Sequence, residues 1–122
     1  MSCMPRFVLF LLAVAIVCPC AALAQEKKYG PGVNDTEIKL GQTMPLSGPI
    51  SALSAVGKSG AAYFDMINAQ GGVNGRKIRL IMRDDGYNPV KTVEHTRSLV
   101  EQEGVLALFA SLGGTTNGAI RK

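Results

Sequence analysis

Two stretches of this 122-residue chain combine glycine with hydroxyl side chains, the residue types that could bind a small molecule. They are Met44–Pro49 (MPLSGP) and Ser111–Thr116 (SLGGTT), which follow predicted β-strands at 38–42 and 105–109. Hydroxyl groups and the unpaired amides at the start of a helix both donate hydrogen bonds to an anion. We therefore expect these stretches to form the walls of a ligand site. The hydroxyls would also serve as caps of the next helix.

Other motifs that could do chemistry are incomplete. The triplet Gly57-Lys58-Ser59 is similar to the end of a phosphate-binding loop. However, Ala52 stands where that loop needs its first glycine, and the triplet falls inside a predicted helix. The pair Asp84-Asp85 is typical of turns and hydrogen bonds at a strand end. His95 is the sole histidine and no cysteine follows residue 20, so no metal site is predicted. Because no hydroxyl has a recognisable base nearby, we expect no catalytic residues, no cofactor and no enzyme activity.

The first 24 residues are predicted to be a secretory signal peptide. Arg6 supplies a positive charge, Phe7–Val17 is an uninterrupted apolar run, and Ala22-Leu23-Ala24 has the small residues that signal peptidase requires. Cleavage between Ala24 and Gln25 would release a periplasmic protein. An uncleaved membrane anchor is the alternative, but the apolar run is short for a span.

Cysteine content and charge give no reason to expect a disulfide-bonded or nucleic-acid-binding protein after cleavage. All three cysteines, at positions 3, 18 and 20, lie in the predicted signal peptide, so no disulfide is expected after cleavage. Removing Arg6 takes one positive charge from the formal +4 and leaves +3. Such a small and scattered charge gives no reason to expect nucleic acid as a partner.

The rest of the chain is predicted to alternate strands and helices. The predicted elements are strands at 38–42, 77–83 and 105–109, helices at 51–69 and 89–103, and the start of a helix at 117–122. Residues 25–34 are expected to be a flexible leader. Asn88 and Pro89 are the types preferred at the N-cap and the first position of a helix. In the first helix, the residues expected to face the sheet are Leu53, Val56, Gly60, Phe64 and Ile67.

This order of elements predicts an α/β fold, a parallel three-layer α/β/α sandwich. Right-handed crossovers with the strand order 2-1-3 place the two helices on opposite faces of the sheet. The second strand is then an edge, in agreement with its alternating charges. Ligands of open α/β sheets bind beyond the carboxyl ends of the strands, where the strand order reverses. The loops after the first and third strands would therefore line one crevice.

The predicted sheet is small for a complete domain. Three strands with one helix on each face leave the strand at 105–109 uncovered along one edge. We therefore expect residues 35–122 to be the incomplete N-terminal part of a longer protein. The exposed apolar edge would also make an isolated 25–122 fragment unstable or prone to associate.

The chain presents, in order, a secretory leader, the loop Met44–Pro49, the turn Asn68–Arg76, the pair Asp84-Asp85 and the loop Ser111–Thr116. Together these motifs resemble the type I periplasmic solute-binding proteins, in particular the leucine/isoleucine/valine-binding receptors of ABC importers. The resemblance covers residues 35–120 and implies two α/β lobes that close on a solute, with this chain as the first part of lobe one. It further implies a small carboxylate-bearing ligand, a membrane permease as partner, and a monomer when full length.

The resemblance also implies which residues contact the ligand. They are Ser111, Leu112, Gly113, Gly114, Thr115, Thr116 and Leu53. Gly113 stands where some relatives have a ligand-contacting serine, and Leu53 where they have an aromatic residue. Three kinds of ligand therefore stay open. They are a branched-chain amino acid, another carboxylate such as an aromatic acid, and an amide. A sensor ectodomain of the same fold and a secreted α/β enzyme are the alternative functions.

The cleavage site gives a direct prediction. N-terminal sequencing of the exported protein should read Gln25-Glu26-Lys27, because Ala22 and Ala24 fit the two positions that the peptidase reads. A chain that begins at Cys18 or Cys20, or one that retains Met1, would contradict this assignment.

Overall fold

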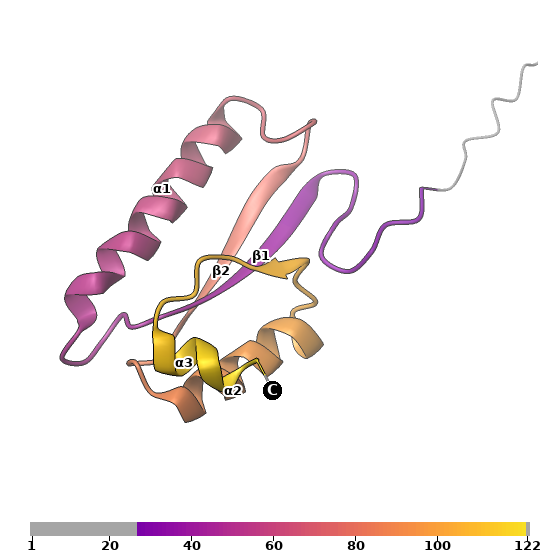
Figure 1. The fold of residues 1–122 in the computed structure, drawn as a ribbon. Coiled ribbons are helices and arrows are strands. Elements are labelled where there is room, and N and C mark those ends of the chain that lie inside the picture. The colour runs from indigo at the N-terminus through magenta and orange to yellow at the C-terminus, as the bar shows by residue number, and fades with distance from the viewer. Residues whose placement is uncertain (1–26, 122) are drawn as a thin grey trace, which may run out of the picture.

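The computed structural model describes residues 27–121, so the predicted signal peptide and its cleavage site at Ala24 and Gln25 lie outside the described residues. Its elements follow the predicted alternation (Figure 1). In chain order they are β1 (Glu37–Met44), a 3₁₀ turn (Ser51–Leu53), α1 (Ser54–Ala69), β2 (Lys77–Asp84), α2 (Pro89–Arg97), a π-helical turn (Ser98–Gln102), β3 (Ala107–Leu108) and α3 (Gly114–Ala119). No helix between residues 27 and 121 is long and apolar enough to cross a membrane.

The sheet has three parallel strands in the order β2-β1-β3, which confirms the predicted topology. β1 pairs with β2 along its whole length, from Glu37 opposite Lys77 to Met44 opposite Asp84. β3 is much shorter than predicted, with Ala107 opposite Leu40 and Leu108 opposite Gly41. The flanking amides of Leu106 and Phe109 donate to Lys39 O, at 2.9 Å, and to Gly41 O, at 2.7 Å. The chain leaves the strand because Ala110 adopts a left-handed conformation, with φ 46°.

Helices cover both faces of the sheet, as the crossover rule predicts. α1 lies on one face, and α2 and α3 lie together on the other (Figure 1). Two glycines allow close approach on the two faces. A methyl group at Gly57 would lie 2.9 Å from Met44 Cε on the α1 face, and one at Gly41 would lie 3.2 Å from Leu99 Cδ1 on the α2 face. Met44 and Leu99 are themselves fully buried.

The face that α1 turns to the sheet differs from the predicted one only in its first turn, whereas Gly60, Phe64 and Ile67 are partly buried as expected. Leu53 and Val56, both expected to be buried, are 45% and 54% exposed, whereas Ser54 and Gly57 are buried. The chain enters α1 through the 3₁₀ turn at 51–53, and the small residues let the helix approach the sheet more closely than a leucine and a valine would.

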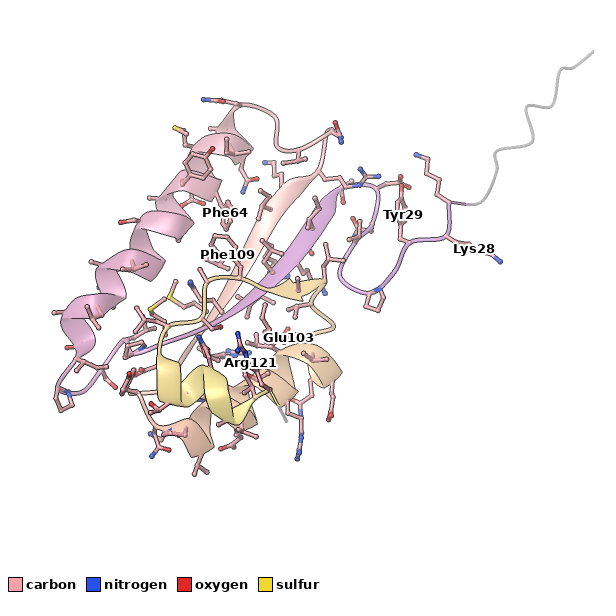
Figure 2. All side chains as sticks on the ribbon, viewed as in Figure 1. Lys28, Tyr29, Phe64, Glu103, Phe109 and Arg121 are labelled. Atoms are coloured by element: carbon pink, nitrogen blue, oxygen red, sulfur yellow. The ribbon has the colours of Figure 1, made fainter. Side chains whose placement is uncertain are left out.

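Aromatic packing joins the middle of α1 to the end of β3. The rings of Phe64 and Phe109 lie 5.0 Å apart between the helix and the sheet (Figure 2). This tilted arrangement is favourable for aromatic pairs. The contact confirms that Phe64 faces the sheet.

The start of α2 is capped as predicted. Asn88 Oδ1 accepts hydrogen bonds from the amides of Val90, at 2.9 Å, and Lys91, at 3.4 Å, and Pro89 occupies the first helical position. The predicted helix to Glu103 is instead divided, because its last turn is π-helical and the Glu103 amide donates to Ser98 O. This widened turn leaves Leu99 in the core.

The described part of the expected leader, residues 27–34, contacts the sheet through polar groups. Tyr29 OH donates to Asp35 Oδ1 at 2.6 Å and accepts from Arg76 Nη2 at 2.9 Å. Arg76 Nε also donates to Asn34 O at 2.7 Å. These bonds tie the segment to the amino end of β2, opposite the loops considered below.

Two glycines of α1 offer a matched test of this packing in the full-length protein. Gly60→Ala should raise the free energy of unfolding by about 0.5–1 kcal/mol, because alanine is the better helix former and its methyl meets Phe109 at an ordinary 3.5 Å. Gly57→Ala should lack this gain, since its methyl is forced against Met44 and Gln42. Urea unfolding would measure both, and equal stabilisation by the two variants would contradict the packing.

Candidate ligand site

Backbone hydrogen bonds bring together the loops that follow β1 and β3. The Leu112 amide donates to Thr43 O at 3.3 Å, and the Thr43 amide donates to Ser111 Oγ at 3.2 Å. The two predicted walls therefore lie side by side at the carboxyl edge of the sheet. This is the location that the strand order 2-1-3 predicts for a ligand crevice.

The Ser111–Thr116 loop is a tight structure whose shape depends on Gly113. This residue has φ 122° and forms the N-cap of α3. A Cβ at this position would overlap Thr116 Oγ1 and the Tyr87 ring, so the backbone leaves no room for a side chain. The loop itself therefore requires a glycine at position 113.

The hydroxyl groups of this loop divide into internal and exposed ones. Thr116 is fully buried and its hydroxyl donates to Leu112 O at 2.9 Å. Ser111 is half-buried and its hydroxyl accepts from the Thr43 amide. Thr115 is exposed. The hydroxyls of Ser111 and Thr116 therefore stabilise the loop, and Thr115 is the one that faces solvent.

α3 begins earlier than predicted, at Gly114 rather than at Asn117. Asn117 closes its first turn, because its amide donates to Gly113 O at 3.0 Å and its side chain donates to Ser111 O at 2.8 Å. Thr115 and Thr116 consequently lie in the first turn. The amides that open a helix have no acceptor within it, so they are available to a ligand or to water.

The loop after β1 forms the opposite wall and is mainly apolar. Met44 and Pro45 are buried under it, and Leu46 is 36% exposed at its surface. Leu53 lies at the far end of this wall, where the 3₁₀ turn meets α1. Among residues 27–121, no hydrogen bond joins Leu53 to the Ser111–Thr116 loop, and its amide donates to Ile50 O at 3.0 Å.

Asp84 fixes the position of this apolar wall, a role that the sequence indicated only as hydrogen bonding at a strand end. Its Oδ1 accepts from the amides of Leu46, at 2.9 Å, Ser47, at 3.2 Å, and Gly86, at 3.0 Å. The Ser47 hydroxyl and then these amides hold the pKa of Asp84 below its usual value, against the opposing effect of burial.

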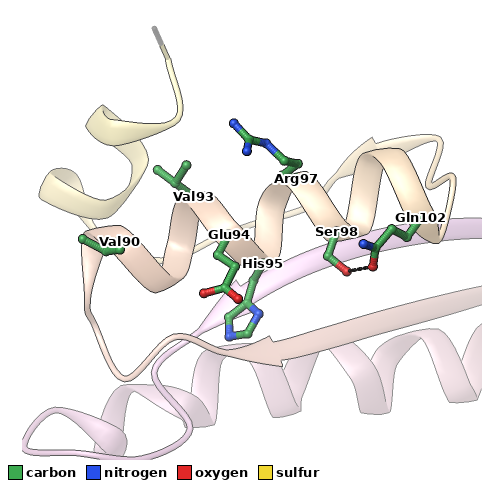
Figure 3. A pocket seen from close by; sticks show the side chains of 7 residues that line it. All are labelled: Val90, Val93, Glu94, His95, Arg97, Ser98 and Gln102. Carbon is green, nitrogen blue, oxygen red and sulfur yellow. Dashed lines mark hydrogen bonds between the residues drawn. The ribbon is translucent and has the colours of Figure 1, made fainter.

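A separate concavity of about 420 Å³ lies on α2, away from these loops (Figure 3). It is lined by Val90, Val93, Glu94, His95, Arg97, Ser98 and Gln102. All of them belong to α2 and the turn that follows it, so a single helix forms the whole surface. His95 already has a polar partner, since its Nε2 lies 3.1 Å from Asp84 O. The candidate ligand site is therefore at the strand ends, where the loops after β1 and β3 meet the end of β2.

Metal chemistry has no support in the part of the chain that the structure describes. No group of three histidine, cysteine, aspartate or glutamate side chains is arranged there to hold an ion. The loops after β1 and β3, residues 44–53 and 111–116, carry neutral hydroxyl and apolar side chains, a composition typical of small-solute sites.

Two neighbouring threonines test the internal role of the loop hydroxyls. In the full-length protein, Thr116→Val should lower the free energy of unfolding by about 1–3 kcal/mol, because the hydrogen bond from the fully buried Thr116 to the Leu112 carbonyl is lost. Thr115→Val should change it by no more than about 0.5 kcal/mol, since that side chain is exposed. Urea unfolding of the two isosteric variants measures both values. Equal stabilities, or the reverse order, would show that the Thr116 hydroxyl does not support the loop.

Comparison with known proteins identifies the family. The family described as "Periplasmic binding protein" matches residues 37–122. The "Leu/Ile/Val-binding protein homolog 7" of Brucella abortus (strain 2308) is 34% identical over 83 residues, which are 67% of this chain and 21% of that protein.

Solved structures agree in both sequence and fold. The fatty acid ABC transporter substrate-binding protein from Thermomonospora curvata matches with a TM-score of 0.66 and 36% identity, over 76% of this chain and 24% of that one. The branched-chain amino acid transporter substrate binding protein LivJ from Streptococcus pneumoniae, in complex with isoleucine, matches with a TM-score of 0.66 and 28% identity. That match covers 70% of this chain and 25% of the other.

The chain thus spans about a fifth of the curated relative and about a quarter of these two structures. The matched proteins are named as binding proteins, which agrees with the expectation of a non-enzymatic chain. The family match includes every strand and helix from β1 to α3 and both loops of the crevice. The predicted resemblance is therefore confirmed, and this chain belongs to the periplasmic binding protein family.

Proposed function

We propose that this chain is the first part of the substrate-binding component of an ABC importer, and that it holds a small carboxylate-bearing solute in the periplasm. The observation that carries the proposal is the convergence of two loops at the carboxyl ends of adjacent parallel strands, joined through Thr43, Ser111 and Leu112. The proposed partners are the solute and a membrane permease. A predicted signal peptide ahead of the fold supports the periplasmic location.

The chemistry of the crevice favours a carboxylate at one end of the solute. Neither 44–53 nor 110–117 contains an acidic or basic residue, so the available donors are neutral. Thr115 and the first amides of α3 are the exposed donors of the Ser111–Thr116 loop. Amides and hydroxyls that converge on a charged oxygen form stronger hydrogen bonds than they form with a neutral one.

The opposite wall favours an apolar remainder of the solute. Leu46 and Leu53 expose a third to a half of their surface there, and Pro45 and Pro49 offer no amide donors. The similar protein from Thermomonospora curvata is named for a fatty acid, and LivJ from Streptococcus pneumoniae is in complex with isoleucine. Both of these molecules combine a carboxylate with a hydrocarbon part. We therefore propose that Thr115 and the start of α3 hold the carboxylate, and that Leu46 and Leu53 contact the hydrocarbon.

Calorimetry on the full-length protein tests this proposal with two matched pairs of probes. The carboxylates are L-isoleucine and octanoate, and the counterparts in which an uncharged amide replaces the carboxylate are L-isoleucine amide and octanamide. At least one carboxylate should bind, and its amide should bind about tenfold more weakly or worse, because a hydrogen bond to a charged group is worth about 1.5–3 kcal/mol. Binding of an amide as tightly as its carboxylate would contradict a carboxylate site.

A further inference from the structure

The Asp84 side chain joins the end of β2 to the loop after β1. One carboxylate oxygen accepts from the amides of Leu46 and Ser47 on that loop and from Gly86 on its own turn, all at 2.9–3.2 Å. A second connection lies beside it, since Met44 O accepts from the amides of Leu46, at 2.9 Å, and Asp85, at 3.2 Å. The ends of the two paired strands are therefore cross-linked by side chain and backbone together.

The loop has few other contacts that could fix its shape. The residues from Leu46 to Pro49 are all exposed, so they contribute little packing. The two prolines lack amide donors, and the next backbone bond, from the Ser51 amide to Gly48 O at 3.1 Å, is local. The Asp84 carboxylate is thus the main attachment of Leu46 and Ser47 to the folded sheet.

The neighbouring aspartate is directed to a different element. Asp85 is fully buried, with Oδ1 accepting from the Tyr87 amide at 2.9 Å and Oδ2 accepting from the Thr92 hydroxyl at 2.8 Å. It therefore secures the start of α2. The two neighbouring carboxylates therefore stabilise different elements. Asp84 binds the loop after β1, and Asp85 binds the start of α2.

We propose that Asp84 is a positioning residue, whose carboxylate holds the loop after β1 in its binding shape before any ligand arrives. The inference rests on the proposed function, because that loop is the apolar wall of the proposed site. A preformed wall spares the ligand the cost of ordering the loop on binding. Loss of the carboxylate should then weaken binding although Asp84 itself is not proposed to touch the ligand.

The hydrogen bonds also give this contact a defined pH dependence. Because they lower the pKa of Asp84, the contact is complete above the ordinary aspartate value of about 3.9 and is lost as pH falls through the lower value in the folded protein. The titratable groups around Asp84 are Asp85, Tyr87 and His95, whose Nε2 lies near Asp84 O. The adjacent Arg83 is paired with Glu103 at 2.6 Å.

The test uses ¹⁵N-labelled full-length protein without ligand. Lowering the pH should move the amide signals of Leu46, Ser47 and Gly86 together, with one midpoint below the ordinary aspartate value. Asp84→Ala should abolish this step and speed hydrogen exchange at Leu46 and Ser47 at least tenfold, because it removes the acceptor oxygen of both amides. Exchange at strand amides such as that of Leu40 should stay unchanged. Asp65→Ala is the matched control, because Asp65 is exposed on α1, and it should behave like the parent.

Binding supplies the second readout, with octanoate and L-isoleucine as probes. The probe that binds the parent should bind Asp84→Ala at least tenfold more weakly and Asp65→Ala equally well. Unchanged exchange and signals of the loop in Asp84→Ala, or parental affinity, would overturn the inference. If the parent binds neither probe, the proposed function fails while the amide measurements still decide the role of Asp84. If Asp84→Ala unfolds, the pH titration of the parent alone decides it, and no common midpoint for the three amides would refute the contact.

Discussion

The rest of the structure depends on the continuous parallel pairing of β1 with β2. Eight residues of each strand stay in register from Glu37 opposite Lys77 to Met44 opposite Asp84. This register sets the ends of both strands at the same level, so that Asp84 reaches the loop that leaves β1. It also leaves the other edge of β1 for β3, whose following loop is then adjacent. The pairing of β1 with β2 therefore brings together the loop after β1, the loop after β3 and the Asp84 side chain.

Polar groups replace hydrocarbon at the carboxyl end of this small core. Thr43, Asp85, Thr92 and Thr116 are all fully buried there, and Gln42 is nearly so. Most of the partners that these side chains have are backbone groups of the surrounding loops, such as Ala110 O, which accepts from Gln42 Nε2 at 3.0 Å. Thr43 Oγ1 and Gln42 Oε1 have no partner among the described residues. Burial of polar groups is unfavourable unless they are paired, so the pairs that do form stabilise particular loop conformations rather than the core as a whole. A preformed binding surface requires that kind of specificity.

The topology could be predicted from the sequence because it follows from local patterns. Apolar runs bounded by glycine clusters define the strands, and Asn88 with Pro89 marks the start of α2. Local patterns did not predict the exposure of Leu53 and Val56 at the start of α1, the short β3 or the burial of Thr116. Each is decided by tertiary contacts, including the close approach at Gly57 and the left-handed turn at Ala110. The loops of the site were identified by composition, but their internal hydrogen bonds depend on residues brought from other strands, as with Asp84.

We propose that the loops after β1 and β3 form the two walls of a carboxylate site. The decisive measurement is a crystal structure of the full-length protein with a bound carboxylate solute. A carboxylate oxygen should lie within hydrogen-bond distance of the Thr115 hydroxyl or of the first amides of α3, with the hydrocarbon against Leu46 and Leu53. A carboxylate held by other segments, or a solute bound on the α2 surface, would contradict it.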